Sequence, residues 1–250
     1  MVAYRFDVIT SAAFSCLKII LSYVLWSAIF SAKSVIDGYT LNMMVSYFIF
    51  CNFISSLERA GSVSEEMVEE IRLGGFTKYI LKPINNLMYF ASMSFSRTVY
   101  VVGINIVATL LWMVVFAKYI VITTNIFNIF LAIIMVILGL ICLMLFNYFL
   151  TMFTFWFLDI SSFFVLKGMI IEFLTGTLIP LNMFPAVVTN IFKLTPFYYT
   201  VYYPSALLLD KNDGNSFLGI MVLLIWIIIF FFLDLRLYKK GIKKYEGVSA

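Results

Sequence analysis

Long apolar runs separated by short polar stretches dominate the pattern of this chain. A helix that crosses the hydrocarbon core of a bilayer needs about 20 mostly apolar residues. Six segments meet this requirement: residues 17–36, 40–57, 97–117, 126–149, 158–181 and 216–236. The second segment is the weakest of the six, because Asn42, Asn52 and several serines interrupt it. The pattern therefore predicts an all-α polytopic membrane protein with six transmembrane helices.

The turn between the fourth and fifth segments decides how one lysine is interpreted. Asp159 is expected at this turn. If the fifth helix begins near residue 158, Lys167 lies inside the bilayer and must face protein or a water-filled cavity; if it begins nearer residue 166, Lys167 flanks the membrane. Lys167 and Glu172 lie about 140° apart around a helix, so we do not expect them to pair. Both are candidate pathway or intramembrane polar residues.

Composition supports the membrane assignment and removes several kinds of chemistry. Hydrophobic residues make up 63% of the chain and charged residues 12%, with a mean hydropathy of +1.04. A soluble fold of this length could not cover so much apolar surface. The chain has no histidine, and its three cysteines have no CxxC spacing, so neither a metal site nor a disulfide framework is expected. No cleavable signal peptide is expected, and the first helix is expected to direct insertion.

The basic residues predict the orientation of the chain, since short cytoplasmic loops carry an excess of Lys and Arg. With the N-terminus in the cytoplasm, twelve basic residues fall on or near the inner side: Arg5, Lys18, Arg59, Arg72, Lys78, Lys82, Arg97, Arg236, Lys239, Lys240, Lys243 and Lys244. Four fall outside: Lys33, Lys118, Lys193 and Lys211. Both termini are therefore predicted to be cytoplasmic.

The most charged stretch, EEMVEEIRLGGFTKYILKP, lies in the connection between the second and third segments, residues 58–96. Ser62 and Glu65 fit a capping box, and Gly74-Gly75 predicts the end of a short helix. Its apolar face is formed by Met67, Val68 and Ile71, and a second amphipathic piece carries Phe76, Tyr79 and Ile80 opposite Lys78 and Lys82.

Two interpretations of this first helix stay open. It is either a solvated loop helix or a docking helix whose apolar face enters a groove on a soluble partner. The pairs Glu65/Glu69 and Glu66/Glu70 place like charges one turn apart, which mildly destabilises an isolated helix.

The connection between the last two segments, residues 182–215, is apolar and aromatic, yet three prolines interrupt it: Pro185, Pro196 and Pro204. A single continuous helix is therefore not expected, and short helices at the outer interface are predicted. Four tyrosines are expected at the level of the lipid headgroups: Tyr198, Tyr199, Tyr202 and Tyr203.

Motifs for catalysis are missing from the sequence. It contains no GxxxxGK[ST] loop, no GxSxG elbow and no HExxH pair, and the glycines of RLGGFTK follow no strand. We expect no catalytic residue, no metal and no cofactor in this chain. One possible function for a membrane protein without catalytic motifs is that of a stand-alone secondary transporter or channel; against this alternative, no inverted repeat is visible.

Several short motifs occur in a fixed order along the chain. They are Gly74 or Gly75, Ile80, Leu81, Lys82 and Pro83; Phe155-Trp156; Phe184-Pro185, Thr195-Pro196-Phe197 and Tyr202-Tyr203-Pro204; and Gly241 with Lys244-Tyr245-Glu246. With these motifs the chain resembles the ABC-2 class of bacterial ABC exporter permeases, in the six-span subgroup of similar length. It departs from the usual pattern at Lys82, where Arg is common, and at Thr195, where Leu is common.

The resemblance implies one permease domain over residues 1–250, located in the bacterial cytoplasmic membrane. Residues 1–16 would form an amphipathic connecting helix, residues 58–96 a cytoplasmic coupling loop, residues 182–215 an external loop with short helices, and residues 237–250 a basic cytoplasmic tail. The ATPase-coupling residues would be Glu65, Glu66, Met67, Val68, Glu69, Glu70, Ile71 and Arg72.

The partners implied by the resemblance are a second permease, identical or homologous, and two separate ATPase subunits that bind ATP and Mg. The cargo would leave through the permease–permease interface, lined mainly by the first, second and fifth helices. An apolar and aromatic lining suits a lipophilic or amphipathic molecule.

Overall fold

The computed structural model describes residues 17–81, 85–157, 161–211 and 214–248, and this part of the chain is all-α. It begins with the Leu17–Phe30 helix. The elements that follow are α2 (Leu41–Ser56), α3 (Ala60–Arg72), α4 (Thr77–Ile80), α5 (Asn86–Val115), η1 (Ala117–Tyr119), α6 (Ile126–Met152), η2 (Phe153–Phe155), α7 (Ser161–Leu174), η3 (Leu181–Met183), α8 (Ala186–Phe192), η4 (Phe197–Tyr199), α9 (Tyr202–Leu208) and α10 (Ser216–Val248).

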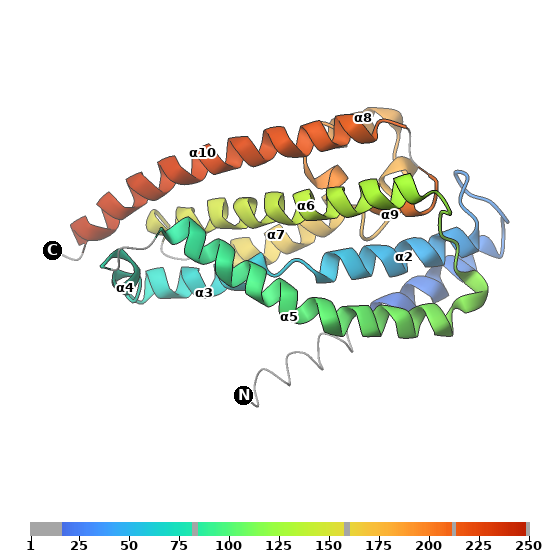
Figure 1. The fold of residues 1–250 in the computed structure, drawn as a ribbon, viewed down its shortest axis with the longest axis horizontal. Coiled ribbons are helices and arrows are strands. Elements are labelled where there is room, and N and C mark those ends of the chain that lie inside the picture. Colours follow the sequence, from blue (N-terminus) through green and yellow to red (C-terminus); the bar gives the residue numbers. More distant parts are fainter. Residues whose placement is uncertain (1–16, 82–84, 158–160, 212–213, 249–250) are drawn as a thin grey trace.

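The helices form an elongated bundle with α6 at its centre (Figure 1). Helix α6 contacts α10 along most of its length and also packs against α9, α3 and α5. The short helices α3 and α4 lie at the same end of the bundle as the C-terminal end of α10, while α8 and α9 lie toward the other end (Figure 1). The bundle therefore has two chemically different ends joined by long helices.

Three helices in the described part of the chain are long and apolar enough to cross a membrane, within Asn86–Val115, Ile126–Phe155 and Ser216–Tyr245. The Leu17–Phe30 helix is apolar but shorter. Helix α2, with 16 residues, rises about 24 Å, less than the roughly 30 Å of a hydrocarbon core. Each of the six predicted segments overlaps a helix, but only three satisfy the length criterion.

Two of the long helices extend beyond their predicted limits. Helix α5 begins at Asn86, inside the stretch expected to be a loop, and the Asn85 side chain accepts a hydrogen bond from the backbone N–H of Met88 to cap it. Helix α10 continues to Val248, so the lysines expected on a tail stand on a helix instead. Sequence hydropathy ends a span where polar residues begin, whereas the helical hydrogen-bond pattern continues through them.

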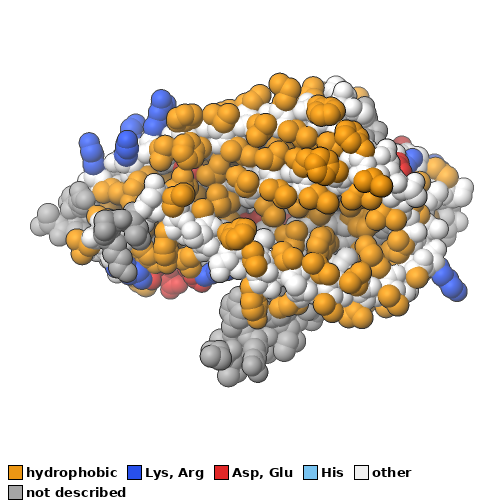
Figure 2. Space-filling model, in the orientation of Figure 1, with side chains coloured by type: hydrophobic (Ala, Val, Ile, Leu, Met, Phe, Trp, Pro, Cys, Tyr) orange, Lys and Arg blue, Asp and Glu red, His pale blue; other side chains and the backbone are white. Residues whose placement is uncertain are grey.

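Apolar side chains cover the middle of the visible face, and most charged side chains gather near the two ends (Figure 2). Helices α5, α6 and α10 each contribute exposed large hydrophobic residues, among them Val107, Leu111, Ile133 and Ile228. An apolar surface of this extent is typical of contact with lipid.

The tyrosines expected at the headgroup level are buried inside the bundle. Tyr198, Tyr199, Tyr202 and Tyr203 are all at most 3% exposed, and their rings contact one another. Gly139 of α6 permits this close packing, because a Cβ added there would lie 3.0 Å from the Thr200 Cα. These tyrosines therefore face protein and anchor the 197–208 segment against α6, while their level in the bilayer stays a prediction.

Candidate functional site

Helix α3 is attached to the bundle by its apolar face. Val63, Met67, Val68 and Ile71 are all at most 5% exposed, and α3 packs against α6 and α5. These positions recur at helical spacing and form a single stripe. The expectation that the apolar face enters a groove on a partner is therefore wrong, because this chain's own helices already cover it.

The start of α3 differs from the predicted cap, whereas its end agrees with the prediction. The helix begins at Ala60, and the Ser62 hydroxyl donates to the Arg59 carbonyl, so Ser62 lies in the first turn and is not the cap. The Glu58 carboxylate accepts from the backbone N–H of Gly61 at 3.0 Å and thereby satisfies one of the free N–H groups of the first turn. The predicted stop is confirmed, since Gly74 has a φ of +77° just after the helix ends.

The opposite face of α3 is acidic. Glu65, Glu66 and Glu69 are exposed, and Glu70 is half-buried. The Glu66 carboxylate pairs with Arg97 of α5 at 2.5 Å, which offsets part of the repulsion within the row.

A second ion pair joins this face to α4. The Glu70 carboxylate lies 2.7 Å from the Lys78 Nζ, and this hydrogen bond raises the pKa of Lys78. Glu65 and Glu69 have no salt bridge within the described part of the chain. The outer face of α3 is consequently negative.

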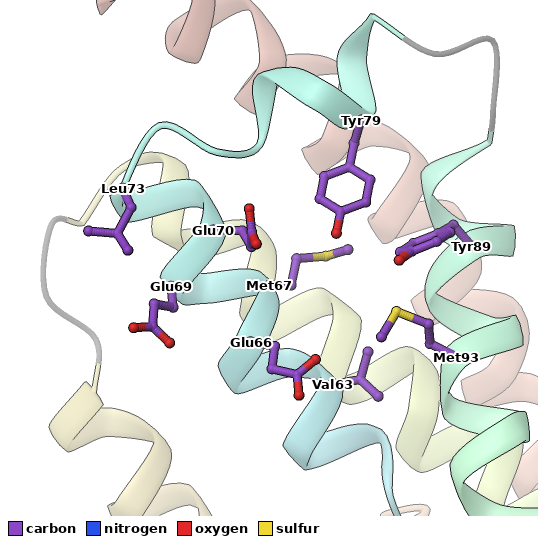
Figure 3. Close-up of a pocket in the computed structure, with 9 residues that line it drawn as sticks. All are labelled: Val63, Glu66, Met67, Glu69, Glu70, Leu73, Tyr79, Tyr89 and Met93. Atoms are coloured by element: carbon purple, nitrogen blue, oxygen red, sulfur yellow. The ribbon is translucent and has the colours of Figure 1, made fainter. Parts of the chain in front are cut away.

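A groove of about 260 Å³ lies between α3, α4 and α5 (Figure 3). The carboxylates of α3 lie across the groove from the rings of Tyr79 and Tyr89, whose centroids are 5.1 Å apart. The lining residues are Val63, Glu66, Met67, Glu69, Glu70, Leu73, Tyr79, Tyr89 and Met93. Apolar side chains next to carboxylates and aromatic faces suit a side chain with an apolar stem and a cationic end.

A polar network joins the start of α3 to α6 and α7. Lys167 of α7 donates to the Asn147 Oδ1 at 2.5 Å, and the Asn147 Nδ2 donates to the Glu58 Oε1 at 3.2 Å. Burial raises the pKa of Glu58, while its hydrogen bond from Gly61 and the charge of Lys167 act in the opposite direction. The network links the α2–α3 turn, α6 and α7.

Lys167 has protein partners in the structure, whereas its depth in the bilayer stays a prediction. The residue lies in the middle of α7, near the ring of Phe164, and its ammonium group faces protein. It does not pair with Glu172, as expected. Glu172 instead binds Lys18, which lies in the first helix, at 2.5 Å.

Sequence reasoning did not single out Glu58, Asn147 or Lys18 as members of these networks. Asn147 could have been noticed, because it is one of only two amides, with Asn128, within the predicted span 126–149. The partners of Glu58 and Lys18 are far apart in the sequence, so no local spacing indicates them.

A second groove, of about 410 Å³, lies between the Leu17–Phe30 helix, α2 and the chain just after α7. It is lined by Lys18, Ile19, Leu21, Ser22, Leu25, Trp26, Phe48, Asn52, Ser55, Thr177 and Leu178. Lys18 gives it one charged boundary, Ser22 and Asn52 are polar, and the rest of the wall is mostly apolar. Such a lining suits an amphipathic molecule.

Some predicted features cannot be located. The connecting helix at residues 1–16, Asp159, Lys82 and Pro83 all lie outside the described residues. Within the described ranges, no cluster of three or more His, Cys, Asp or Glu side chains could hold a metal ion.

Comparison with known proteins gave one family match. A family model described as an ABC-2 family transporter protein matches residues 16–249. No curated protein matches the chain.

Proposed function

The chain belongs to the ABC-2 family of transporter proteins and is a multi-helix membrane component of that family; on this premise we propose that it is the permease subunit of an ATP-driven exporter. Two permeases, identical or homologous, form the pathway, and two separate ATPase subunits supply the energy. ABC-2 permeases generally work with ABC ATPase partners and are typically non-catalytic. The cytoplasmic membrane of a bacterium is the proposed location.

The six-span arrangement is part of the proposal. Helices α5, α6 and α10 are long enough to cross a bilayer by themselves. The Leu17–Phe30 helix, α2 and α7 complete the set if local thinning of the bilayer or flanking residues compensate for their length. Both termini and α3 then lie on the cytoplasmic side, and α8 and α9 on the outer side.

The observation that carries the proposal is the attachment of α3. Its apolar stripe is buried against α6 and α5, while Glu65, Glu66 and Glu69 face outward at the end of the bundle. A helix fixed in this way can transmit a force that is applied to its outer face. We assign ATPase docking to this outer acidic face, with Arg72 and the exposed Leu73 at its end.

Three contacts would carry the movement of α3 into the bundle. The Arg97–Glu66 pair couples it to α5, and the Glu58–Asn147–Lys167 network couples it to α6 and α7. Packed helices move as rigid bodies when a contact at one end is displaced. Closure of the ATPase dimer would therefore shift α5, α6 and α7 together.

Charge reversal on the outer face of α3 tests the docking surface. Glu69→Lys should reduce association with the ATPase subunit at least about tenfold, since docking electrostatics depend on complementary charge. Association is measured by co-purification and by titration of the purified subunits. The Lys118→Glu variant, at an exposed residue of η1, is the matched control and should associate normally. Unchanged association of Glu69→Lys and of the triple reversal with Glu65 and Glu66 would contradict the proposal.

A further inference from the structure

An ion pair lies on the apolar side of the bundle, beside the larger groove. Lys18 Nζ and Glu172 Oε1 are 2.5 Å apart, and their side chains are 54% and 45% exposed. Lys18 lines the groove of about 410 Å³. The pair therefore remains accessible to a molecule that enters the groove.

The surroundings of this pair are apolar. Leu17 and Leu21 flank Lys18 and are more than half exposed, and Ile170 and Phe173 are exposed beside Glu172. Within a bilayer such side chains face lipid, so the two charges stand at a place where ionic groups are costly and often functional. In this structure the Lys18 ammonium and the Glu172 carboxylate are each other's ion-pair partner.

The charge balance limits what the groove can bind. A ligand that carries one charge can engage Lys18 or Glu172 only by leaving the other without a partner, which is unfavourable away from water. A zwitterion can replace one ion pair by two, because its anionic group meets Lys18 and its cationic group meets Glu172. The net charge of the site then stays at zero throughout.

The remainder of the groove matches the rest of such a molecule. Ser22 lies one helical turn from Lys18, and Asn52 adds an amide, so uncharged polar groups stand next to the charged boundary. Leu21, Leu25 and Phe48 supply an apolar wall for a hydrocarbon tail.

We propose that this groove binds zwitterionic amphiphiles, with Lys18 and Glu172 as the two headgroup contacts. The inference rests on the proposed function, since it names the class of molecule that the transporter accepts. Both charged residues are specificity determinants, and the apolar wall sets the requirement for a tail.

The test uses the purified complex of the permease with its ATPase subunits in a neutral detergent. Three probes share an octyl tail and differ in headgroup charge: octylphosphocholine, octyl phosphate and octyltrimethylammonium. Binding is measured as the concentration of each probe that half-maximally raises the thermal unfolding midpoint, because a ligand that binds the folded state stabilises it. Wild-type protein should bind octylphosphocholine about tenfold more tightly than either charged probe.

The variants should change this order in opposite directions. In Lys18→Ala the remaining carboxylate should favour octyltrimethylammonium about tenfold over octyl phosphate, and in Glu172→Ala the order should reverse. The exchanged pair, Lys18→Glu with Glu172→Lys, should restore the zwitterion preference. Lys33→Ala, which removes an exposed lysine just beyond the same helix, is the matched control and should resemble wild type.

Two results would overturn the inference. One is an order of probe affinities that is the same in wild type and in both single variants. The other is absence of octylphosphocholine binding; disulfide crosslinking of two permeases through Leu21→Cys would then show that a second copy fills the groove. In either case, retained complex assembly and ATP hydrolysis would leave the proposed permease function intact, whereas loss of assembly in wild type would contradict that function instead.

Discussion

At the scale of single residues, Asn147 has a connecting role that its chemistry explains. An amide offers both an acceptor and donors, and here the Asn147 Oδ1 accepts a hydrogen bond from Lys167 while the Asn147 Nδ2 donates one to Glu58. Neither a carboxylate nor an ammonium group could satisfy both neighbours at once. A neutral bridge therefore holds a cation and an anion in one buried network without adding a third charge.

Replacing this amide by an apolar residue of similar size should be costly. Asn147→Leu removes the hydrogen bonds that Asn147 makes with the Lys167 ammonium and the Glu58 carboxylate, and we expect a loss of about 2–3 kcal/mol in the free energy of unfolding. Denaturant unfolding of the purified protein in detergent measures it. Asn105→Leu is the control, since the Asn105 amide makes a single contact with the Ser56 carbonyl at 3.5 Å. Equal stability of Asn147→Leu and wild type would show that the network is not coupled to folding.

At the scale of elements, α3 has two faces with different tasks. The stripe that includes Met67 fastens the helix to α6 and α5, and the outer row of carboxylates remains available. The distinction matters because the same helix was expected to dock through its apolar stripe. An apolar stripe on a short helix indicates only that something covers it, and either the same chain or another protein can do so.

A matched pair of substitutions separates the two tasks. Met67→Asp places a carboxylate at a position that is 4% exposed, and we expect it to destabilise the fold by about 3–5 kcal/mol and to reduce the amount of folded protein. Leu73→Asp makes a similar change at a position that is 78% exposed. It should leave the unfolding midpoint unchanged. Size-exclusion profiles and thermal unfolding of both variants report the difference, and equal stability of the two would refute the assigned orientation of α3.

Features that depend on residues close together in the sequence were predicted, whereas features that depend on contacts between distant segments were not. The six apolar segments, the position of α3 and its stop at Gly74 depend on neighbouring residues, and each was predicted. The extension of α5 back to Asn86 was not predicted, since hydropathy does not register a polar helical turn. The burial of Tyr198 and Tyr203 was also missed, because it depends on α6 packing against a distant segment.

The networks of the candidate site were the least predictable part. Lys167 was recognised as unusual, but its partner could be identified only when α6 and α7 were placed side by side. The same holds for Lys18 and Glu172, which are 154 positions apart in the chain. Charges in apolar segments can be found by inspection, whereas their pairing is a property of the tertiary structure.

At the scale of the whole molecule, the two ends of the bundle differ in shape and charge. One end carries α3, α4 and the lysine-rich end of α10, and the other carries η1, α8 and α9 (Figure 1). Contacts among the residue before α4, η2 and α10 hold the first end together, since the rings of Phe76, Phe155 and Tyr245 pack against one another. Under the proposed topology this end meets the ATPase subunits.

Single cysteines test the orientation of the whole bundle. Cys16, Cys51 and Cys142 are first replaced by alanine, and the two described ones are buried and unpaired, so a small replacement should be tolerated. Glu69→Cys and Lys239→Cys should react with a membrane-impermeant maleimide only after the cells are opened, because an excess of basic residues is retained on the cytoplasmic side. Lys118→Cys, at the opposite end of the bundle, should react in intact cells. Reaction of Glu69→Cys in intact cells would place α3 outside the cell, where no ATPase subunit could bind it, and the proposed energy coupling would fail with the topology.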